Sequence, residues 1–377
     1  MTRPLSAVFA DPGAVMVALR RALAGDGAAI LPHPTPSSVV GSLPATVPQR
    51  VALVVETSGS TGRPKRVMLS ANALLASAAA TDTALGGPGQ WMLALPAHYI
   101  AGINVLVRSI AAELDPVILD ANRSFTPELF LASADRFAHP RRFVSLVPTQ
   151  VARLIESAEA VEVLRGFERV LVGGQAMPGA LRERVTELGL PVTRTYGSSE
   201  TSGGCVYDGR PIGDTQVRVV DGRVELGGSV LADGYLDDPR RTAFSFLEEG
   251  GERWYRTDDV GEFVDGVLRV RGRVDDVIIS GGVKVLLAEV EDVVRSLPGL
   301  GGAVVVGAPH PEWGEAPVVV SAVAAEVEQV RAAVAARLGP AAAPARILLV
   351  DRVPELPSGK PDRVAIVALV LKASPSA

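Results

Sequence analysis

Cysteine is almost absent from this chain, and that absence limits its chemistry. Cys205 is the only cysteine among 377 residues, so neither an intrachain disulfide nor a cysteine metal cluster is possible. No uninterrupted apolar run is long enough to span a bilayer, and the first residues lack the charged and then apolar pattern of a secretory signal. We therefore expect a cytoplasmic protein with no insertion into a membrane.

Runs of basic residues are missing as well. The formal net charge is −5, and without a basic run we do not expect nucleic acid as a partner. Hydrophobic residues make up 47% of the chain and charged residues 21%. This composition indicates a well-buried globular protein, and the length is enough for two or three cores.

Lysine is scarce, which makes its positions informative. It occurs only at Lys65, Lys284, Lys360 and Lys372, while arginine supplies the other basic residues. The first three lie in segments rich in glycine together with serine or proline. Lysine is a flexible point charge, whereas arginine is a rigid fork. We interpret these three lysines as selected for the ammonium group, with exposed loop lysines as the simpler alternative.

The most informative stretch is Thr57-Ser-Gly-Ser-Thr-Gly-Arg-Pro-Lys65. An apolar run at 51–55 before it predicts a buried strand, and a helix is predicted over 70–83. The glycines allow backbone N–H groups to surround an anion, the hydroxyls add donors, and Lys65 adds positive charge. The stretch predicts a loop that binds nucleotide phosphates, although a polar surface turn is the plainer alternative. Its spacing does not fit the mononucleotide P-loop.

Strands and helices alternate from residue 51 to residue 195. This alternation predicts a mostly parallel sheet covered by helices on both faces, whose ligands bind beyond the carboxyl ends of the strands. After the strand at 51–55 we expect strands at 91–95, 116–119, 143–147, 169–172 and 191–195. The expected helices lie at 13–24, 101–112, 127–137, 149–158 and 178–188, and a loop is expected at 35–49.

After Gly203 the pattern changes to alternating residues around Asp221-Gly222 and Asp265-Gly266. Such dipeptides between alternating runs predict hairpins, and hence an antiparallel subdomain. A small C-terminal unit should hold helices near 288–297 and 327–338 and strands at 303–306, 318–323 and 347–350. We therefore expect an α/β fold with a large domain at 1–271 and a small α+β domain at 277–377.

Four further segments, in order after the phosphate loop, resemble the acyl-adenylating superfamily of acyl-CoA ligases, luciferases and peptide-synthetase adenylation domains. They are Tyr196-Gly-Ser-Ser-Glu-Thr-Ser-Gly-Gly204, Tyr255-Arg-Thr-Asp-Asp-Val-Gly261, Gly272-Arg-Val-Asp-Asp-Val-Ile-Ile-Ser-Gly-Gly-Val-Lys284 and Pro357-Ser-Gly-Lys-Pro-Asp-Arg363. With the loop they span roughly residues 51–363. The resemblance implies an enzyme that activates an acid with ATP and Mg²⁺ and passes the acyl group to the thiol of CoA.

The resemblance also implies an ATP site. Phosphate contacts are expected from Thr57, Ser58, Gly59, Ser60, Thr61, Gly62, Lys65 and Ser199. Adenine and ribose contacts are expected from Gly174, Gln175, Ala176, Tyr196, Gly197, Asp259 and Arg273. Glu200 is expected to hold Mg²⁺, which takes oxygen ligands from few carboxylates plus phosphates. Asp258 stands where the family has glycine, which leaves open which aspartate binds the ribose.

The same resemblance assigns roles near the C-terminus. Lys360 is expected to contact the acid and the α-phosphate, and with Glu200 and His98 to form the catalytic set. Asp275 is expected to be the hinge, within 272–276, about which the small domain turns. Gly281, Gly282 and Lys284 are expected on the CoA side.

The acid itself is suggested by a closer resemblance. The segments at 95–109, 173–178 and 199–209 are similar to the o-succinylbenzoate–CoA ligases of menaquinone biosynthesis. Acid contacts are then expected from His98, Ala101, Gly102, Ser198, Ser202 and Gly203, with Arg108 as a candidate for the second carboxylate. The small residues should leave room for a ring. Another aryl- or acyl-CoA ligase and a carrier-protein-loading adenylation domain remain alternatives, and a homodimer is left open.

Overall fold

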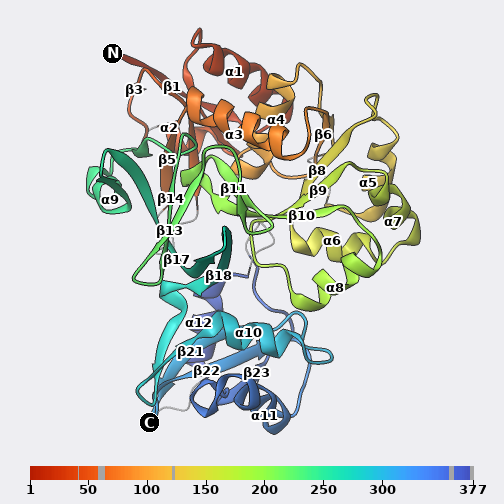
Figure 1. The fold of residues 1–377 in the computed structure, drawn as a ribbon, viewed down its shortest axis with the longest axis vertical. Coiled ribbons are helices and arrows are strands. Elements are labelled where there is room, and N and C mark those ends of the chain that lie inside the picture. The colour runs from red at the N-terminus through yellow and green to blue at the C-terminus, as the bar shows by residue number, and fades with distance from the viewer. Residues whose placement is uncertain (41, 58–63, 121–123, 356–360, 374–377) are drawn as a thin grey trace.

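The computed structural model describes residues 1–40, 42–57, 64–120, 124–355 and 361–373. Within these ranges the strands form four sheets. Figure 1 shows three of them with their helices in one large unit, and the fourth in a smaller unit at the C-terminal end. The expected α/β fold, with a large N-terminal part and a small C-terminal part, is confirmed.

The first sheet is mixed and has the order β15-β5-β4-β2-β1-β3. Its strands are β1 (Thr2–Phe9), β2 (Ala29–His33), β3 (Thr46–Pro48), β4 (Val51–Thr57), β5 (Lys65–Ser70) and β15 (Gly234–Tyr235). Only the β1–β2 and β2–β4 pairs are parallel. Strand β3 and the short helix α2 (Ser37–Val40) lie where the sequence predicted only a loop.

Strand β5 is a second departure from the sequence prediction. Residues 65–70, between the expected phosphate loop and the next helix, form this strand. It pairs with β4 in an antiparallel ladder in which Lys65 lies opposite Thr57. Val67 and Leu69 are fully buried and alternate with more exposed neighbours, which is the period of two that a strand requires. The phosphate motif therefore connects two antiparallel strands. Its residues 58–63 lie outside the described ranges.

The second sheet has the order β12-β11-β10-β9-β8-β6-β7 and is parallel from β10 to β7. Its strands are β6 (Gln90–Leu93), β7 (Val117–Ile118), β8 (Arg142–Leu146), β9 (Arg169–Val172), β10 (Val192–Ser198), β11 (Gly203–Tyr207) and β12 (Arg210–Pro211). The strands predicted from 91–95 to 191–195 are all present in this sheet, whereas the one predicted at 51–55 is β4 of the first sheet. Strand β10 continues through Tyr196 to Ser198, and a one-turn helix, η1 (Ser199–Thr201), leads from it into β11.

Helices fill the space between these sheets and cover the outer face of the second one. Helices α1 (Pro12–Ala24), α3 (Ala71–Ala84) and α4 (Ile100–Ala111) pack on one another. Helix α3 contacts strands of both sheets, whereas α4 contacts β6, β8 and β11 of the second sheet. The outer face is covered by α5 (Pro127–Ala134), α6 (Pro148–Leu154), α7 (Ala158–Arg165) and α8 (Gly179–Glu187). The helix predicted over 149–158 is α6, which ends at Leu154, and α7 was not predicted. Ser157 caps α7, because its hydroxyl accepts a hydrogen bond from the Ala160 amide at 3.3 Å.

Between the sheets lies a continuous apolar core. Leu53 from β4, Trp91 from β6 and Ile103 from α4 all belong to it and are essentially unexposed. Trp91 stacks on Phe143 with ring centroids 4.9 Å apart. Helix α3, which contacts both sheets, is capped at its N-terminus by Ser70. The Ser70 hydroxyl accepts a hydrogen bond from the Ala73 amide at 3.1 Å. This core holds the strand ends of both sheets in fixed relative positions.

The third sheet is antiparallel and confirms the hairpins predicted at Asp221-Gly222 and Asp265-Gly266. Its strands are β13 (Gln216–Val220), β14 (Arg223–Gly227), β16 (Phe246–Glu249), β17 (Glu252–Val264) and β18 (Val267–Arg273), and α9 (Pro239–Ser245) precedes β16. Glu225 on β14 is 1% exposed. It lies between Arg218 at 2.7 Å and Arg256 at 2.9 Å.

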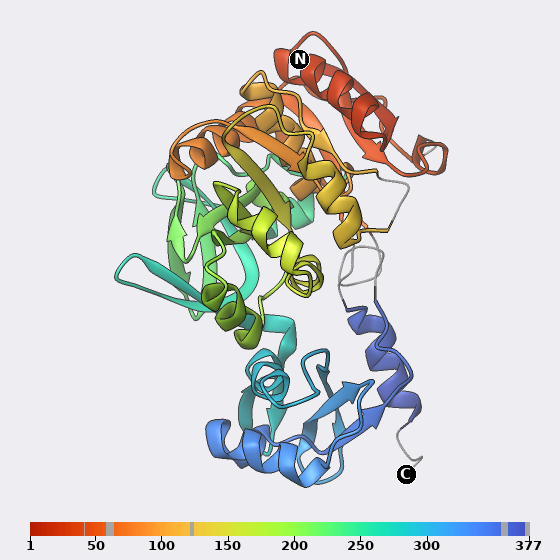
Figure 2. The same ribbon diagram turned by 90° about the vertical axis from the view of Figure 1, so that its right-hand side faces the viewer.

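The smaller unit begins after β18. It contains β19 (Val277–Ser280), β20 (Val283–Leu286), β21 (Val304–His310), β22 (Gly314–Ser321), β23 (Arg346–Leu349), α10 (Leu287–Arg295), α11 (Val327–Leu338) and α12 (Arg363–Lys372), with one-turn helices η2 (Val274–Asp276) and η3 (Pro340–Ala342). Strands β19 and β20 and helix α12 were not predicted from the sequence. Figure 2 shows this unit set apart from the larger one.

An ion-pair bridge crosses the junction between the two units. Arg271 on β18 pairs with Glu262 on β17 at 2.9 Å and with Glu289 on α10 at 2.6 Å. The neighbouring Gly272 packs tightly, since a Cβ there would lie 3.0 Å from Leu286 and from Ala288. None of the helices in the described part of the chain has the length and apolar character needed to cross a membrane.

Replacing Glu225 tests the charged core of the third sheet. Burial alone would raise the pKa of Glu225, but hydrogen bonds from Arg256 and Arg218 outweigh burial and lower it. A carboxyl whose folded pKa is depressed stabilises the fold above its unfolded pKa, and this contribution is lost as the pH falls through the folded pKa. We expect Glu225→Gln to lower the free energy of unfolding by about 2 kcal/mol at pH 7, and by less below about pH 4.

Urea unfolding across a pH series measures this difference. Glu249→Gln is the matched control, because Glu249 pairs with the same Arg218 but its side chain is 66% exposed. The control should change stability by less than about 0.5 kcal/mol. Equal losses in the two variants at pH 7 would contradict the assignment.

Candidate active site

Three segments that follow strands of the second sheet meet at one edge. The loop after β6 leads to Ile100, the first residue of α4, which lies close to Gly203 after the turn that follows β10. A Cβ atom added to Gly203 would be 3.7 Å from the Ile100 side chain. The segment after β9 reaches the same place, since a Cβ on Gly173 would lie 2.3 Å from Thr195 Oγ1. The sequence placed the site at these carboxyl ends, and the structure brings them together.

Glu200 lies in η1 at this edge and is 6% exposed. Its Oε1 accepts a hydrogen bond from the Tyr235 hydroxyl at 2.8 Å, and its backbone carbonyl accepts from the Ala232 amide at 2.8 Å. Among the described residues the Glu200 carboxylate has no ion-pair partner at 4 Å or less. A buried carboxylate held only by neutral donors lacks a counter-charge, which a cation supplies at low cost.

The donor chemistry around Glu200 fits Mg²⁺ bound to a nucleotide. No group of three or more histidine, cysteine, aspartate or glutamate side chains gathers as a metal site in the part of the chain that the structure describes. A cation at Glu200 would therefore take its remaining ligands from phosphate oxygens and water, which is how Mg²⁺ is usually held in nucleotide enzymes.

The phosphate motif reaches the same place from the first sheet. Lys65 at the start of β5 has its ammonium nitrogen 6.0 Å from the centre of the Tyr235 ring, and Thr57 is its partner across the ladder. Tyr235 thus contacts Glu200 through its hydroxyl and faces Lys65 through its ring. The expected phosphate residues Ser58, Gly59, Ser60, Thr61 and Gly62, and the expected catalytic Lys360, lie outside the described ranges.

Tyr196, Asp259 and Arg273 also lie together, on β10, β17 and β18. The Tyr196 hydroxyl donates to Asp259 Oδ2 at 2.7 Å, and Arg273 is 3.7 Å from Asp259 Oδ1. Burial raises the pKa of Tyr196, and the nearby Asp259 carboxylate adds to this. Burial also raises the pKa of Asp259, against the opposing influence of Tyr196 and Arg273.

The structure separates the two neighbouring aspartates. Asp258 pairs with Arg223 at 3.0 Å and with Arg273 at 3.5 Å, whereas Asp259 is turned toward Tyr196. The residue that replaces the family's glycine is therefore held by Arg223 within the third sheet. Asp259 is the aspartate that shares a place with the expected adenine-binding tyrosine.

The remaining residues expected at the base lie on exposed backbone. Gly174 and Ala176, after β9, are exposed, and Gln175 between them is half-buried. Gly174 has a φ of +83°, a left-handed conformation that favours glycine. Gly197 is exposed on β10. Their contacts with adenine stay predictions.

The glycines on the acid side do not provide the open room that the sequence suggested. A Cβ on Gly102 would lie 2.2 Å from the Pro96 carbonyl oxygen, and one on Gly203 would lie 2.0 Å from Asn104 Nδ2. Both positions are glycine because other groups approach the backbone closely. That part of the prediction was wrong, while a role for these residues in binding the acid remains untested.

The serines of this turn mainly support it. Ser202 is unexposed and left-handed, with a φ of +53°, and its hydroxyl donates to the Val230 carbonyl at 2.8 Å. The Ser198 hydroxyl accepts from the Glu200 amide at 3.2 Å. Ser199 is buried next to Glu200, and Ala101 is exposed at the start of α4.

Arg108 does not face this site as a free cation. It is 4% exposed, its guanidinium lies 4.6 Å from the centre of the Trp91 ring, and Nη2 is 3.5 Å from the Tyr207 hydroxyl. Its aromatic neighbours hold it inside the helical layer, and this position does not favour it as the partner of a second carboxylate.

His98, which is half-buried, lies shortly before α4. Burial lowers the pKa of His98, and the charge of nearby His33 lowers it further to a smaller extent.

The residues expected to bind CoA and to form the hinge belong to the smaller unit and its border. Gly281 and Gly282 join β19 to β20 with φ values of +56° and +81°, and both are exposed, as is Lys284. Asp275 is exposed in η2 and pairs with Arg273 at 3.3 Å. Arg273 thus contacts the expected ribose residue and the expected hinge residue at once.

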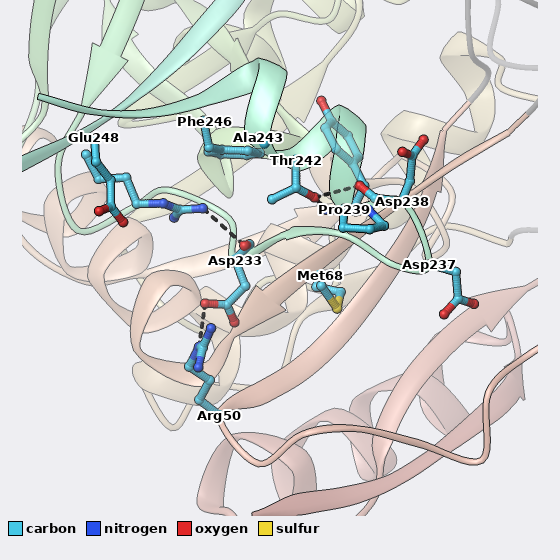
Figure 3. A pocket seen from close by; sticks show the side chains of 12 residues that line it. Arg50, Met68, Asp233, Asp237, Asp238, Pro239, Thr242, Ala243, Phe246 and Glu248 are labelled. Carbon is cyan, nitrogen blue, oxygen red and sulfur yellow. Dashed lines mark hydrogen bonds and ion pairs between the residues drawn. The ribbon is translucent and has the colours of Figure 1, made fainter.

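Tyr235 also lines a hollow of about 660 Å³, whose walls include none of the residues that the sequence predicted for the site. Figure 3 shows its wall, where Arg50 reaches Asp233 at 2.7 Å. The carboxylates of Asp237, Asp238 and Glu248 also line it. This surplus of negative charge is unsuited to the phosphates of ATP.

Tyr235 was missed by the sequence analysis although a signal for it was present. The chain has five tyrosines, and Tyr99, Tyr196, Tyr235 and Tyr255 all lie in or beside the segments of the candidate site. Tyrosine, like lysine, is therefore rare enough in this chain for its positions to indicate the site. Asn104 was also missed, and no sequence signal distinguished it from other polar residues on helices.

Comparisons with known proteins agree with this geometry. The profile described as "AMP-binding enzyme" matches residues 15–233, and the profile of the AMP-binding enzyme C-terminal domain matches residues 289–360. The chain therefore belongs to the AMP-binding enzyme family. A curated relative, the probable 2-succinylbenzoate–CoA ligase of Mycobacterium tuberculosis, is 39% identical over 370 residues, which cover 94% of each chain.

More distant relatives carry the same name. The 2-succinylbenzoate–CoA ligase of Salmonella typhimurium is 31% identical over 76% of this chain and 61% of its own length. Among solved structures, o-succinylbenzoate CoA synthetase from Bacillus subtilis in complex with its acyl-adenylate intermediate aligns with a TM-score of 0.77. It covers 96% of this chain and 87% of that chain at 24% identity, so this likeness shows the fold.

The close contact between Gly203 and Asn104 can be tested by comparing Gly203 with Gly222, a glycine of similar backbone conformation that has free space around it. Gly203 has a φ of +96° and Gly222 a φ of +79°, and only at Gly222 would a Cβ meet nothing within 4 Å. We expect Gly203→Ala to lose at least about 2 kcal/mol more in unfolding free energy than Gly222→Ala, since it adds a clash with Asn104 to the backbone strain. Similar losses by urea unfolding would show that the contact is unimportant.

Proposed function

We propose that this chain is an ATP-dependent ligase that adenylates o-succinylbenzoate and transfers the acyl group to CoA, as a step of menaquinone biosynthesis. The products are o-succinylbenzoyl-CoA, AMP and pyrophosphate. The observation that carries the proposal is the convergence at one sheet edge of a buried, uncompensated Glu200, of Lys65 and of the Tyr196–Asp259 pair. The choice of acid rests on the named relatives.

The chemistry follows from where charge develops. An oxygen of the acid carboxylate attacks the α-phosphorus, and the bond to the bridging oxygen breaks as pyrophosphate leaves. Lys65 and Lys360 supply cations to the phosphate oxygens and the carboxylate, and Asp259 orients the ribose by accepting from its hydroxyls. Mg²⁺ at Glu200 would neutralise phosphate charge. The CoA sulfur then attacks the acyl carbonyl, and AMP leaves.

Two different steps at one site explain a two-domain chain. We assign residues 1–271 to the domain that binds ATP and the acid, 272–276 to a hinge centred on Asp275, and 277–377 to a mobile domain. In this proposal Lys360 serves adenylation, whereas Gly281, Gly282 and Lys284 serve thioester formation after the domain turns. All these residues come from one chain, so the site needs no second copy. The reaction would take place in the cytoplasm, where ATP and CoA are available.

A second candidate is an aryl- or acyl-CoA ligase that acts on an acid with a single carboxylate. The burial of Arg108 against Trp91 favours keeping this candidate, because it removes the cation that the sequence suggested for the second carboxylate of o-succinylbenzoate.

A direct assay distinguishes these candidates. Incubation of the protein with ATP, Mg²⁺, CoA and o-succinylbenzoate should yield the CoA thioester, detected by its mass, together with stoichiometric pyrophosphate. Benzoate and a medium-chain fatty acid should react at least about 100-fold more slowly, since they lack the second carboxylate and would leave unpaired the polar groups that the proposal requires for it. Faster use of either competitor would favour the second candidate. Adenylate formation without transfer to CoA would indicate a carrier-protein-loading domain.

The two neighbouring aspartates provide a matched pair of variants. We expect Asp259→Asn to raise the KM for ATP at least about tenfold, because a neutral amide accepts more weakly from ribose hydroxyls. Asp258→Asn should change the KM for ATP less than about threefold, since Asp258 pairs with Arg223 and Arg273 and not with the nucleotide in this proposal. Initial rates of pyrophosphate release measure both values. The reverse order would assign the ribose to Asp258.

A further inference from the structure

Tyr235 occupies an unusual position between the phosphate motif and the metal-binding candidate. It is 4% exposed and lies on β15, which pairs with β5 so that Tyr235 faces Val67 across the ladder. Its backbone amide donates to Thr242 Oγ1 at 2.9 Å, and its ring packs 5.9 Å from that of Phe246. The ring is therefore held from several sides, and its hydroxyl has a fixed direction.

That direction is toward Glu200. The Tyr235 hydroxyl donates to Oε1 of the carboxylate at 2.8 Å in a buried contact. One oxygen of Glu200 is thus occupied by a neutral donor, and the carboxylate plane is fixed while the second oxygen is left for another ligand. Hydrogen bonds to ligating carboxylates orient them, and removing such partners commonly weakens metal binding 10- to 100-fold.

The same ring lies beside the other phosphate-binding group. Lys65 has its ammonium nitrogen 6.0 Å from the ring centre, a distance at which a cation is attracted to an aromatic face. The Tyr235 side chain therefore restricts the positions of both Lys65 and Glu200. The proposed function assigns these two groups to the same ATP triphosphate. Tyr235 therefore combines a hydrogen bond to the Glu200 carboxylate with a ring face beside Lys65.

We propose that Tyr235 is a positioning residue that orients the Glu200 carboxylate toward the divalent cation of the ATP complex. This proposal rests on the proposed function, because it takes Glu200 as the ligand of that cation. Tyr235 touches neither the acid nor CoA in this account, so its effect is confined to how the cation strengthens ATP binding.

The test compares ATP binding with and without the cation in Tyr235→Phe, which removes the hydroxyl and keeps the ring beside Lys65. The full-length protein is titrated with ATP by calorimetry in excess EDTA and, separately, in excess Mg²⁺, with no acid and no CoA present. We expect Mg²⁺ to enhance ATP affinity roughly five- to tenfold less in the variant than in the wild type, with the EDTA affinity unchanged within about twofold.

Tyr207→Phe is the matched control. Tyr207 is also buried and its hydroxyl lies 3.0 Å from Thr81 Oγ1, so this change removes a comparable hydrogen bond away from Glu200. Its Mg²⁺ enhancement should equal that of the wild type. A double variant with Glu200→Gln should show no further loss over Glu200→Gln alone, because the hydroxyl then has no carboxylate to orient.

The outcomes are distinct. An undiminished Mg²⁺ enhancement in Tyr235→Phe overturns the proposal, and so does a loss of ATP binding in EDTA, which would mark Tyr235 as a residue needed for folding. If the wild type itself shows no Mg²⁺ enhancement, the assignment of Glu200 within the proposed function fails first. Because no acid is used, the result does not depend on which acid the enzyme activates.

Discussion

A single backbone carbonyl, that of Ser202, ties the candidate site to the core of the molecule. It accepts hydrogen bonds from Asn104 Nδ2 at 2.8 Å and from the Ser77 hydroxyl at 3.1 Å. These donors come from α4 and α3, the helices between the first two sheets. Because a buried carbonyl without partners is costly, the turn after β10 cannot move independently of this helical layer.

The position of Glu200 depends on this constraint. Glu200 is two residues before Ser202, and the left-handed conformation of Ser202 reverses the chain immediately after η1. The first sheet contributes to the same place through β15 and β5, so that Tyr235 and Lys65 approach from the opposite side. The site thus requires both sheets and the layer between them to be folded before its charges come together.

Charge also connects the nucleotide side of the site to the border of the small unit. Arg273 lies within 4 Å of Asp258, Asp259 and Asp275. Its pKa is raised, because attraction from Asp259 and the neighbouring aspartates outweighs the opposing effect of burial. One arginine therefore faces the expected ribose ligand and the expected hinge. A change at either carboxylate alters the electrostatic partner of the other.

Particular errors show where sequence reasoning stopped. Strand β5 was missed because the phosphate motif was interpreted as a loop up to the next helix, although Val67 and Leu69 alternate as in a strand. Gly102 and Gly203 were interpreted as space, because a sequence does not tell a glycine with open surroundings from one that faces a nearby backbone. Arg108 was a candidate for the second carboxylate, because its burial beside Trp91 depends on packing that the sequence does not show.

The sequence by itself determined the fold class, the order of most strands and helices, and the motifs that mark an adenylate-forming enzyme. These depend on local periodicity, turn residues and short-range spacing, which are written along the chain. Only the tertiary structure decided that Tyr235 donates to Glu200, that Asp258 is taken by Arg223 while Asp259 faces Tyr196, and that Arg108 is interior. Such contacts join residues up to 99 positions apart, and they arise from strand pairing and from packing between distant segments, which no local pattern encodes.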